Sequence, residues 1–474
     1  MRVDGAMRGA LGLAALVAAL PAAAAGAGET APAFTGAGLS VLWAIPFAGL
    51  LASLALGPMV APDFWHRHYG KIASAWALAF LIPLTALYGA GEAFRELVHA
   101  LLLEYLPFVI VLFALYTIAG GIAVRGTLVG TPALNTGLIG LGAALASAMG
   151  TTGAAMLLIR PLLRANQARR RRVHIVVFFI ILVGNVGGAL TPLGDPPLFL
   201  GFLNGVDFFW TARTLALPTL ALTGILLAIF HVLDRWLWRG ESVAVPTRYE
   251  PLAIDGAVNF ALIAGVAGAV LLSGVWKPGI VFDVAGTPLA LQNIVRDGAL
   301  LALALASLAL TPRTVRADNA FSWAPMGEVA KLFAGIFLTI IPVLAMLQAG
   351  RAGAFAGVVA LVTDSATGEP RHAMYFWATG LLSAFLDNAP TYLVFFNLAG
   401  GDAATLMDSR QALAAISAGA VYFGALTYVG NAPNFMIKAI AEERGVAMPG
   451  FFGYVAYAAV LLLPLLAAAL WIAL

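Results

Sequence analysis

Acidic and amide side chains interrupt otherwise apolar stretches of this sequence. Asp387 and Asn388 are adjacent, and Asp195 and Asn431 each follow a glycine and precede a proline by one or two positions. A carboxylate in an apolar surrounding resists standing alone as an anion, because low polarity disfavours the charged form. A proton or a bound Na⁺ can neutralise it, so the two ions compete for one site. These residue types therefore predict Na⁺ and H⁺ binding, with Asp195, Asp387, Asn388 and Asn431 as Na⁺ ligands.

The overall composition places these side chains in a membrane protein. Of the 474 residues, 61% are hydrophobic and only 10% are charged, whereas soluble domains carry about 25% charged residues. The sequence contains no cysteine, and its six histidines show no metal-binding spacing, which excludes thiol chemistry and argues against a histidine-based metal site. No phosphate-binding loop is present, which argues against ATP-driven pumping by this chain. No cofactor is expected beyond the transported Na⁺ and H⁺.

Apolar segments of spanning length recur along the chain and predict an all-α membrane protein. Two further stretches, 133–165 and 372–400, have a polar or small-residue tip in the middle, at Gly150–Gly153 and Asp387–Pro390. Two short arms joined by such a tip are typical of a re-entrant hairpin, whose irregular backbone must be enclosed by protein or water. The ten expected spans lie near 39–60, 72–90, 104–124, 173–203, 212–235, 256–275, 296–312, 331–349, 411–440 and 452–474.

The two halves of the chain share a motif. Gly188–Phe199 and Gly424–Phe435 both contain Gly-Ala-Leu-Thr, then Gly, then Asp or Asn, then Pro, at an offset of 236 residues (424 − 188). The hairpins align at the same offset, since Ser147 falls on Ser383. Each half then holds five spans and one hairpin, and an odd number of spans inverts the second half in the membrane. We expect a first repeat at 39–238, a cytoplasmic connector at 239–255 and a second repeat at 256–474.

The shared motif predicts a broken helix in each half, at 173–203 and 411–440. Glycine permits unusual backbone angles and proline removes a backbone donor, so each helix should unwind and restart at the motif. Asp195 and Asn431 could cap the restarted helices, contact an ion, or do both, and Asp387 or Asn388 could cap the second hairpin arm. The candidate ion-binding residues at the breaks and hairpin tips are Thr151, Thr152, Thr191, Asp195, Asp387, Asn388, Thr391, Thr427 and Asn431.

The N-terminus and the basic residues predict the orientation. Residues 1–27 have a basic start, a short apolar run and a small-residue cleavage pattern, as in a signal peptide; an uncleaved first span is the alternative. Lys and Arg concentrate in alternate loops, including Arg169–Arg172, as expected for the cytoplasmic side of an inner membrane. On the second arm of the first hairpin, Arg160 and Arg164 are interpreted as snorkelling toward the cytoplasm rather than as anion ligands.

At Gly188–Phe199, Asp387–Thr391 and Gly424–Phe435 the chain resembles the ion transporter superfamily, which includes NhaD-type sodium/proton antiporters, arsenite permeases, and citrate and dicarboxylate carriers. The resemblance covers nearly the whole chain after about residue 39. It implies two inverted repeats whose hairpins and broken helices meet at the membrane midplane, a homodimer, and elevator-type motion against a scaffold. Carboxylate carriers of this group have Ser-Asn-Thr at the tips. This chain has Gly-Thr-Thr and Asp-Asn-Ala-Pro-Thr, which favours the antiporter branch.

Two alternatives to sodium/proton exchange remain open. Half-helix N-termini carry positive dipole ends that favour an anion, so the second hypothesis is a Na⁺- or H⁺-coupled carrier of citrate, a dicarboxylate or another anion, including an arsenite-type permease. The charges of Asp195 and Asp387, and the lack of a basic residue at the tips and breaks, oppose it. An intramembrane enzyme would need a nucleophile–base or metal constellation, and the sequence offers none. The expected partners are the bilayer, a small inorganic cation and a second copy of the chain, with no nucleic acid.

Overall fold

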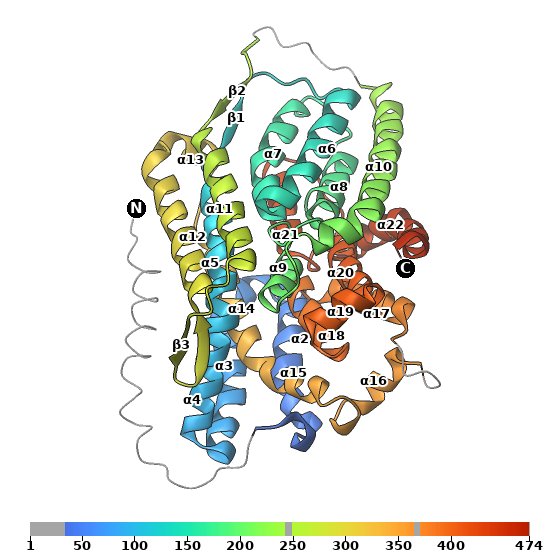
Figure 1. The fold of residues 1–474 in the computed structure, drawn as a ribbon. Helices are drawn as coiled ribbons and strands as arrows, with labels where there is room; N and C mark the ends of the chain where they lie inside the picture. The colour runs from blue at the N-terminus through green and yellow to red at the C-terminus, as the bar shows by residue number, and fades with distance from the viewer. Residues whose placement is uncertain (1–33, 242–248, 365–369, 474) are drawn as a thin grey trace.

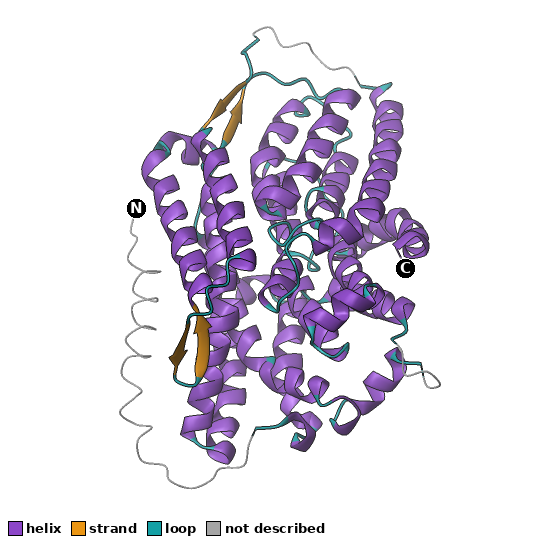
Figure 2. Ribbon diagram, in the orientation of Figure 1, coloured by secondary structure: helices purple, strands orange, loops and turns teal. Residues whose placement is uncertain are grey.

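The computed structural model describes residues 34–241, 249–364 and 370–473, and the predicted signal peptide at 1–27 lies outside them. The described residues are mostly helical, with two short strand pairs (Figure 2). Eight of the described helices are long and apolar enough to cross a membrane, or nine if the bent pair α14 (Ala324–Thr339) and α15 (Ile341–Gln348) counts as one span. The prediction of an all-α, multi-pass membrane protein is therefore confirmed.

Most of the spanning helices are unbroken rods that are apolar on their outer face. Leu78, Ile82 and Leu87 of α3 are each more than half exposed, as expected of a helix that faces a bilayer. A thirty-residue helix is formed by α4 (Ala90–His99), a π-helical turn (Ala100–Tyr105) and α5 (Leu106–Ala119). The other unbroken rods are α2 (Ile45–Val60), α3 (Pro62–Tyr88), α10 (Trp210–Trp238), α11 (Val258–Val275), α12 (Leu291–Leu310) and α22 (Phe451–Ala473).

The stretches predicted as hairpins each consist of two helices joined by a sharp turn. The first comprises α6 (Pro132–Met149) and α7 (Thr151–Ala165), and Gly150 between them has φ 82°, a conformation that side-chain-bearing residues rarely adopt. The second comprises α17 (His372–Phe385) and α18 (Asn388–Leu398), joined without a glycine. The α6 helix is one of the eight candidate spans by its length and apolar composition.

Each stretch predicted as a broken helix consists of two helices separated by irregular backbone. Both first helices are shorter than a span, so the spans predicted at 173–203 and 411–440 are not among the candidate spans. Every residue of α8 after Val173 is buried, so protein and not lipid surrounds the helix that leads into the break. The helices are α8 (Val173–Leu182) with α9 (Pro196–Leu203), and α20 (Gln411–Phe423) with α21 (Ala432–Glu443); 3₁₀ turns at Val186–Gly188 and Gly424–Leu426 follow α8 and α20.

Short elements close the two ends of the molecule. The strand β1 (Ala123–Arg125) pairs antiparallel with β2 (Ala253–Asp255), which attaches the predicted 239–255 connector to the end of α5. A second antiparallel pair is formed by β3 (Val281–Val284) and β4 (Thr287–Ala290). The remaining short helices are α13 (Arg313–Asp318), α16 (Ala356–Val362) and α19 (Ala403–Ser409).

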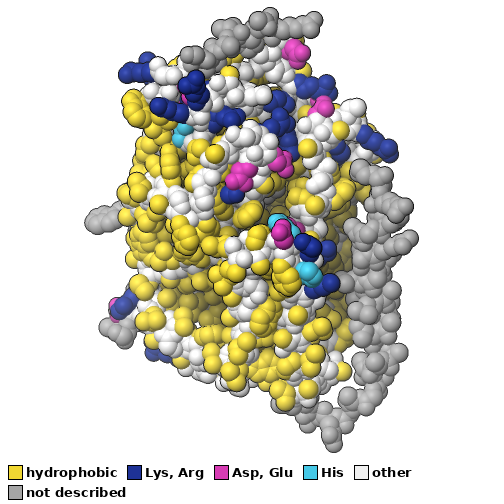
Figure 3. Space-filling view, turned by 180° about the vertical axis from the view of Figure 1, so that it is seen from behind, with side chains coloured by type: hydrophobic (Ala, Val, Ile, Leu, Met, Phe, Trp, Pro, Cys, Tyr) yellow, Lys and Arg dark blue, Asp and Glu magenta, His cyan; other side chains and the backbone are white. Residues whose placement is uncertain are grey.

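The second parts of the two broken helices lie between two groups of helices. In Figure 1, α5, α11 and α12 lie on the left, α6, α7, α8 and α10 lie on the upper right, and α9 and α21 lie between the groups. On the face that it presents, Figure 3 shows a broad apolar band over the middle and lower part of the molecule, interrupted at mid-height by a group of charged and histidine side chains, with many Lys and Arg side chains at the end that carries β1, β2 and α13. That distribution is the one expected when a bilayer surrounds the band and water surrounds the basic end.

Candidate functional site

Four helix N-termini meet around the carboxylate of Asp195. Thr151, the first residue of α7, donates its hydroxyl to Asp195 Oδ1 at 3.2 Å. Asn431, just before α21, donates Nδ2 to the same oxygen at 2.9 Å, and Asn388, the first residue of α18, donates Nδ2 to Oδ2 at 2.5 Å. Asp195 itself precedes α9, and all four residues are 2% exposed or less. A single buried carboxylate therefore links both hairpin tips and both helix breaks.

The expectation that the side chains of Asp195 and Asn431 cap the restarted helices is wrong. Both residues occupy the N-cap position with extended backbone, and prolines follow in the first turns of α9 and α21 as predicted. Neither side chain, however, accepts a capping hydrogen bond. The Asp195 carboxylate receives donors from other elements, and Asn431 Nδ2 donates to Asp195 and to the carbonyl of Gly184. Both side chains are thus turned into the site.

Asp387 has the capping role, and it also faces the site. Its side chain accepts a hydrogen bond from the Ala389 backbone N–H at 3.2 Å, which caps α18. It is 9% exposed and lines the same cavity as Asp195. The neighbouring Asn388 offers a buried Oδ1 that has no hydrogen-bond partner among the described residues. A carboxylate and an unsatisfied amide oxygen next to a second carboxylate are oxygen ligands suited to a hard cation.

Three of the threonines predicted as ion ligands donate their hydroxyls to backbone carbonyl groups and do not line the cavity. Thr191 donates its hydroxyl to the carbonyl of Ser147, and Thr427 donates to that of Ala384, so each break is fastened to the neighbouring hairpin arm. Thr391 donates to the Asp387 carbonyl at 2.9 Å, within its own helix. The assignment of these three as ion ligands stays a prediction, and their hydroxyl protons are already engaged. Thr152, by contrast, is half-buried and lines the cavity.

The cavity beside Asp195 has a volume of about 100 Å³ and two chemically different walls. One wall comes from the hairpin tips and the breaks and includes Thr152, Asp195, Asp387 and Asn431. The other comes from α5 and α14 and is apolar apart from a tyrosine. No Lys, Arg or His is among the described residues that line the cavity. The α5 and α14 residues are Phe108, Val111, Leu112, Leu115, Tyr116, Pro325, Met326, Val329 and Phe333.

Sequence reasoning missed a buried asparagine pair between the two breaks. Asn185 donates Nδ2 to Asn434 Oδ1 at 2.8 Å, and Asn434 donates in turn to the carbonyls of Gly424 and Thr427. The pair joins the first break to the second and holds the unwound backbone that carries Asn431. The sequence feature that could have revealed this pair is the asparagine that directly follows the apolar run Ile180–Gly184.

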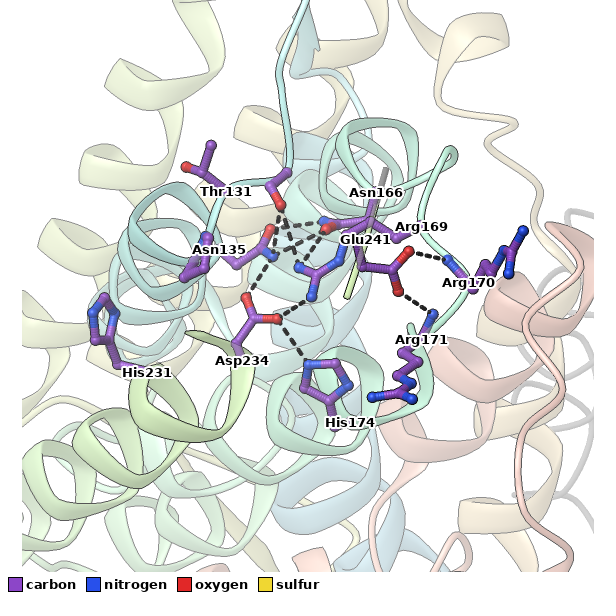
Figure 4. Close-up of polar contacts among 12 residues, drawn as sticks. Thr131, Asn135, Asn166, Arg169, Arg170, Arg171, His174, His231, Asp234 and Glu241 are labelled. Atoms are coloured by element: carbon purple, nitrogen blue, oxygen red, sulfur yellow. Dashed lines mark hydrogen bonds and ion pairs between the residues drawn. The ribbon is translucent and has the colours of Figure 1, made fainter. Parts of the chain in front are cut away.

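A second buried polar cluster, also missed, lies around Asp234 of α10 (Figure 4). Its carboxylate accepts hydrogen bonds from Arg169 at 2.5 Å, from His174 at 2.9 Å and from Asn135 at 2.9 Å. Asn135 and Asn166 also exchange hydrogen bonds, so the cluster ties α6 and the end of α7 to α8 and α10. It fixes the base of the first hairpin, away from the cavity. An aspartate inside an apolar span was the signal that could have found it.

The polypeptide just outside this cluster is held by Glu241. Its carboxylate accepts the backbone N–H groups of Arg170 and Arg171 at 3.0 and 2.9 Å. Burial acts to raise the pKa of Glu241, but these two donors prevail and lower the pKa. The basic run Arg169–Arg172, predicted to mark the cytoplasmic side, is therefore a folded loop in which Arg169 is buried.

Comparison with known protein families gives a match that covers nearly the whole chain. The model of a family described as "Putative citrate transport" matches residues 36–474, which is nearly the whole chain. No curated protein matches the sequence.

Proposed function

This chain belongs to the citrate-transport family whose model it matches, and we propose that within this family it is a secondary transporter exchanging Na⁺, or Li⁺, for H⁺ across the inner membrane. The observation that carries the proposal is the meeting of four helix ends on Asp195, with Asp387 lining the same cavity and no basic side chain among the described lining residues. Two carboxylates without a cationic partner need a proton or a metal cation for charge balance.

The proposed exchange uses competition at this pair of carboxylates. A Na⁺ ion would be held by oxygens of Asp195, Asp387, Asn388 and Asn431, and Asn388 Oδ1 is the acceptor still without a partner among the described residues. A proton on a carboxylate removes the charge that attracts Na⁺, so the ion and the proton exclude each other. The binding site then moves across the membrane only when either Na⁺ or a proton is bound to it.

We also propose that the site moves as a unit within two inverted repeats, 39–238 and 256–474, in a homodimer with elevator-type motion. Matching hydrogen bonds at the repeat offset support the repeats: Leu193 N–H donates to Thr191 and Val429 N–H donates to Thr427, and 429 − 193 equals 427 − 191. The apolar wall supplied by α5 and α14 supports the motion, because a wall without polar partners lets the site slide past without breaking hydrogen bonds.

A cation-coupled carrier of citrate or another anion is the second candidate. Two observations favour it: the family description, and the convergence of helix N-termini, whose dipoles attract an anion. In this version Na⁺ or H⁺ at Asp195 and Asp387 neutralises the carboxylates and the anion binds beside them. The two candidates share the cation site and differ in what else crosses.

Reconstitution into liposomes with an imposed pH gradient tests the proposal. We expect NaCl or LiCl, but not KCl, to collapse the gradient, and Asp387→Asn to abolish the response while the protein stays folded. The matched control is Asp207→Asn, an exposed aspartate in a loop before α10. A response that appears only when citrate accompanies the cation would establish the second candidate instead. Full exchange by Asp387→Asn would contradict the assignment of Asp387.

A further inference from the structure

The carboxylate of Asp195 lies where a bound anion would be held. Thr151 is the first residue of α7, Asn388 is the first residue of α18, and Asn431 directly precedes α21; each donates a side-chain hydrogen bond to this carboxylate. All three donors are buried. A helix N-terminus carries a partial positive charge from its aligned peptide dipoles, so three helix starts with three donors favour a negative group between them.

The three donors use most of the hydrogen-bonding capacity of the Asp195 carboxylate. Oδ1 accepts from Thr151 at 3.2 Å and from Asn431 at 2.9 Å, and Oδ2 accepts from Asn388 at 2.5 Å. An ionised carboxylate accepts about four hydrogen bonds, so about one position on Oδ2 is left for a cation. The Asp387 side chain, in contrast, caps α18 and receives no side-chain donor among the described residues.

The backbone around Asp195 leaves room for this arrangement. Asp195 and Asn431 occupy equivalent positions of the shared motif, 236 residues apart, and they bond directly to each other. A Cβ at Gly188 would lie only 3.2 Å from the Cβ of Asp195 and 2.6 Å from the methyl carbon of Thr151. Glycine at 188 therefore makes space for both the carboxylate and one of its donors.

Neither helix capping nor an ion pair explains the position of this carboxylate. The Asp195 side chain accepts no capping hydrogen bond from α9. None of the ion pairs among the described residues includes Asp195. Its surroundings are neutral donors and helix N-termini, which are the groups that hold anions taken up from solution.

We propose that Asp195 is a built-in anion, whose carboxylate fills an anion-binding position between the helix starts and so excludes the carboxylate of an external substrate. The inference rests on the proposed cation exchange, and it makes Asp195 the residue that determines specificity for a cation over an anion. The converging helix N-termini favour an anion, and this chain supplies that anion itself. Na⁺ then binds at the remaining position of Asp195 together with Asp387.

Removing the carboxyl group of Asp195 and returning it as formate tests the inference. Asp195→Ala deletes one carboxyl group, and formate has the charge and about the size of that group. Sodium formate is titrated against sodium chloride at constant Na⁺ and ionic strength while the melting temperature of the purified protein is measured. We expect a saturable rise in Asp195→Ala that recovers about half or more of the fall caused by the substitution, because formate binds only the folded protein. The natural protein should not respond, since its own carboxylate fills the position.

Two control variants separate this position from the rest of the cavity. Asp387→Ala deletes the same group from the same cavity, but no side-chain donor among the described residues is left without its acceptor there. Asp195→Asn fills the position with an amide. Neither control should show a saturable response to formate. If Asp195→Ala cannot be purified, Asp195→Ser, whose hydroxyl still accepts one of the donors, decides by the same titration.

Two outcomes of the titration would overturn the inference. One is an Asp195→Ala variant that formate does not stabilise. The other is an equal response in the natural protein or in Asp387→Ala, which would show a general effect of formate. Failure of the proposed function is distinguishable, because the titration requires no transport. A natural protein that does not exchange Na⁺ for H⁺ in liposomes contradicts the exchange, whatever the response of Asp195→Ala to formate.

Discussion

At the scale of single residues, Asp195 and Asp387 differ in what surrounds them. Asp195 accepts three side-chain donors, whereas Asp387 accepts a backbone N–H and faces the cavity. An asparagine can replace an aspartate as a helix cap at little cost. An asparagine at 195 would instead place an NH₂ group among the amide donors of Asn388 and Asn431.

We therefore predict that Asp195→Asn and Asp387→Asn both lose ion exchange but differ in stability. Asp387→Asn should melt within a few degrees of the natural protein, because the cap is kept. Asp195→Asn should be destabilised by about 1–3 kcal/mol, because buried donors lose their acceptor. Melting of the solubilised protein, measured alongside proton flux in liposomes, checks both parts. Equal melting temperatures for the two variants would show that the donors around Asp195 contribute no stability.

At the scale of elements, the first hairpin depends on one glycine. Gly150 adopts φ 82° and ψ 149°, a region that residues with side chains occupy only at a cost of about 1–3 kcal/mol. Gly150→Ala should lower the melting temperature and slow exchange, because the strain acts on the turn that positions Thr151. Gly137→Ala is the matched control, since Gly137 lies in α6 with open space around it and alanine favours helix. Unchanged exchange by Gly150→Ala would contradict the role of this turn.

The buried cluster at the base of the first hairpin is also an element-scale feature. Asp234→Asn removes the carboxylate that pairs with Arg169, whose side chain is 1% exposed. An uncompensated buried charge costs about 3–5 kcal/mol, so we expect a large fall in melting temperature. The control Asp207→Asn breaks an exposed pair and should change stability by less than about 1 kcal/mol. If Asp234→Asn melts at the same temperature as the natural protein, the cluster does not hold the hairpin.

At the scale of the whole molecule, the cavity lies between two groups of helices that the proposed motion would separate. Met326 of α14 and Met436 of α21 line it from opposite sides, and Met436 packs against the small apolar cluster that contains Met326. Because the sequence contains no cysteine, a pair of introduced cysteines can test this contact without competing thiols. We predict that cross-linking Met326→Cys to Met436→Cys stops exchange and that reduction restores it.

Each single-cysteine variant should remain active, because one thiol cannot tie the two groups together. The measurement is proton flux in liposomes before and after an added oxidant joins the two thiols in a disulfide, with cross-linking verified by the electrophoretic shift of a chain cut between the two positions. Exchange that persists in fully cross-linked protein would exclude motion of the site past α14.

The sequence by itself determined the class of the molecule and the position of its interruptions. Composition requires a bilayer, and Gly–Asp–Pro at 194–196 stops and restarts a helix, because both effects depend only on neighbouring residues and on the solvent. What only the tertiary structure decided is the use of each side chain. Asp195 meets Asn388 and Asn431, which lie 193 and 236 residues away along the chain. Local pattern therefore could not show that the Asp195 side chain makes no capping hydrogen bond, that the Asp387 side chain does make one, or that α5 and α14 close the cavity with an apolar wall.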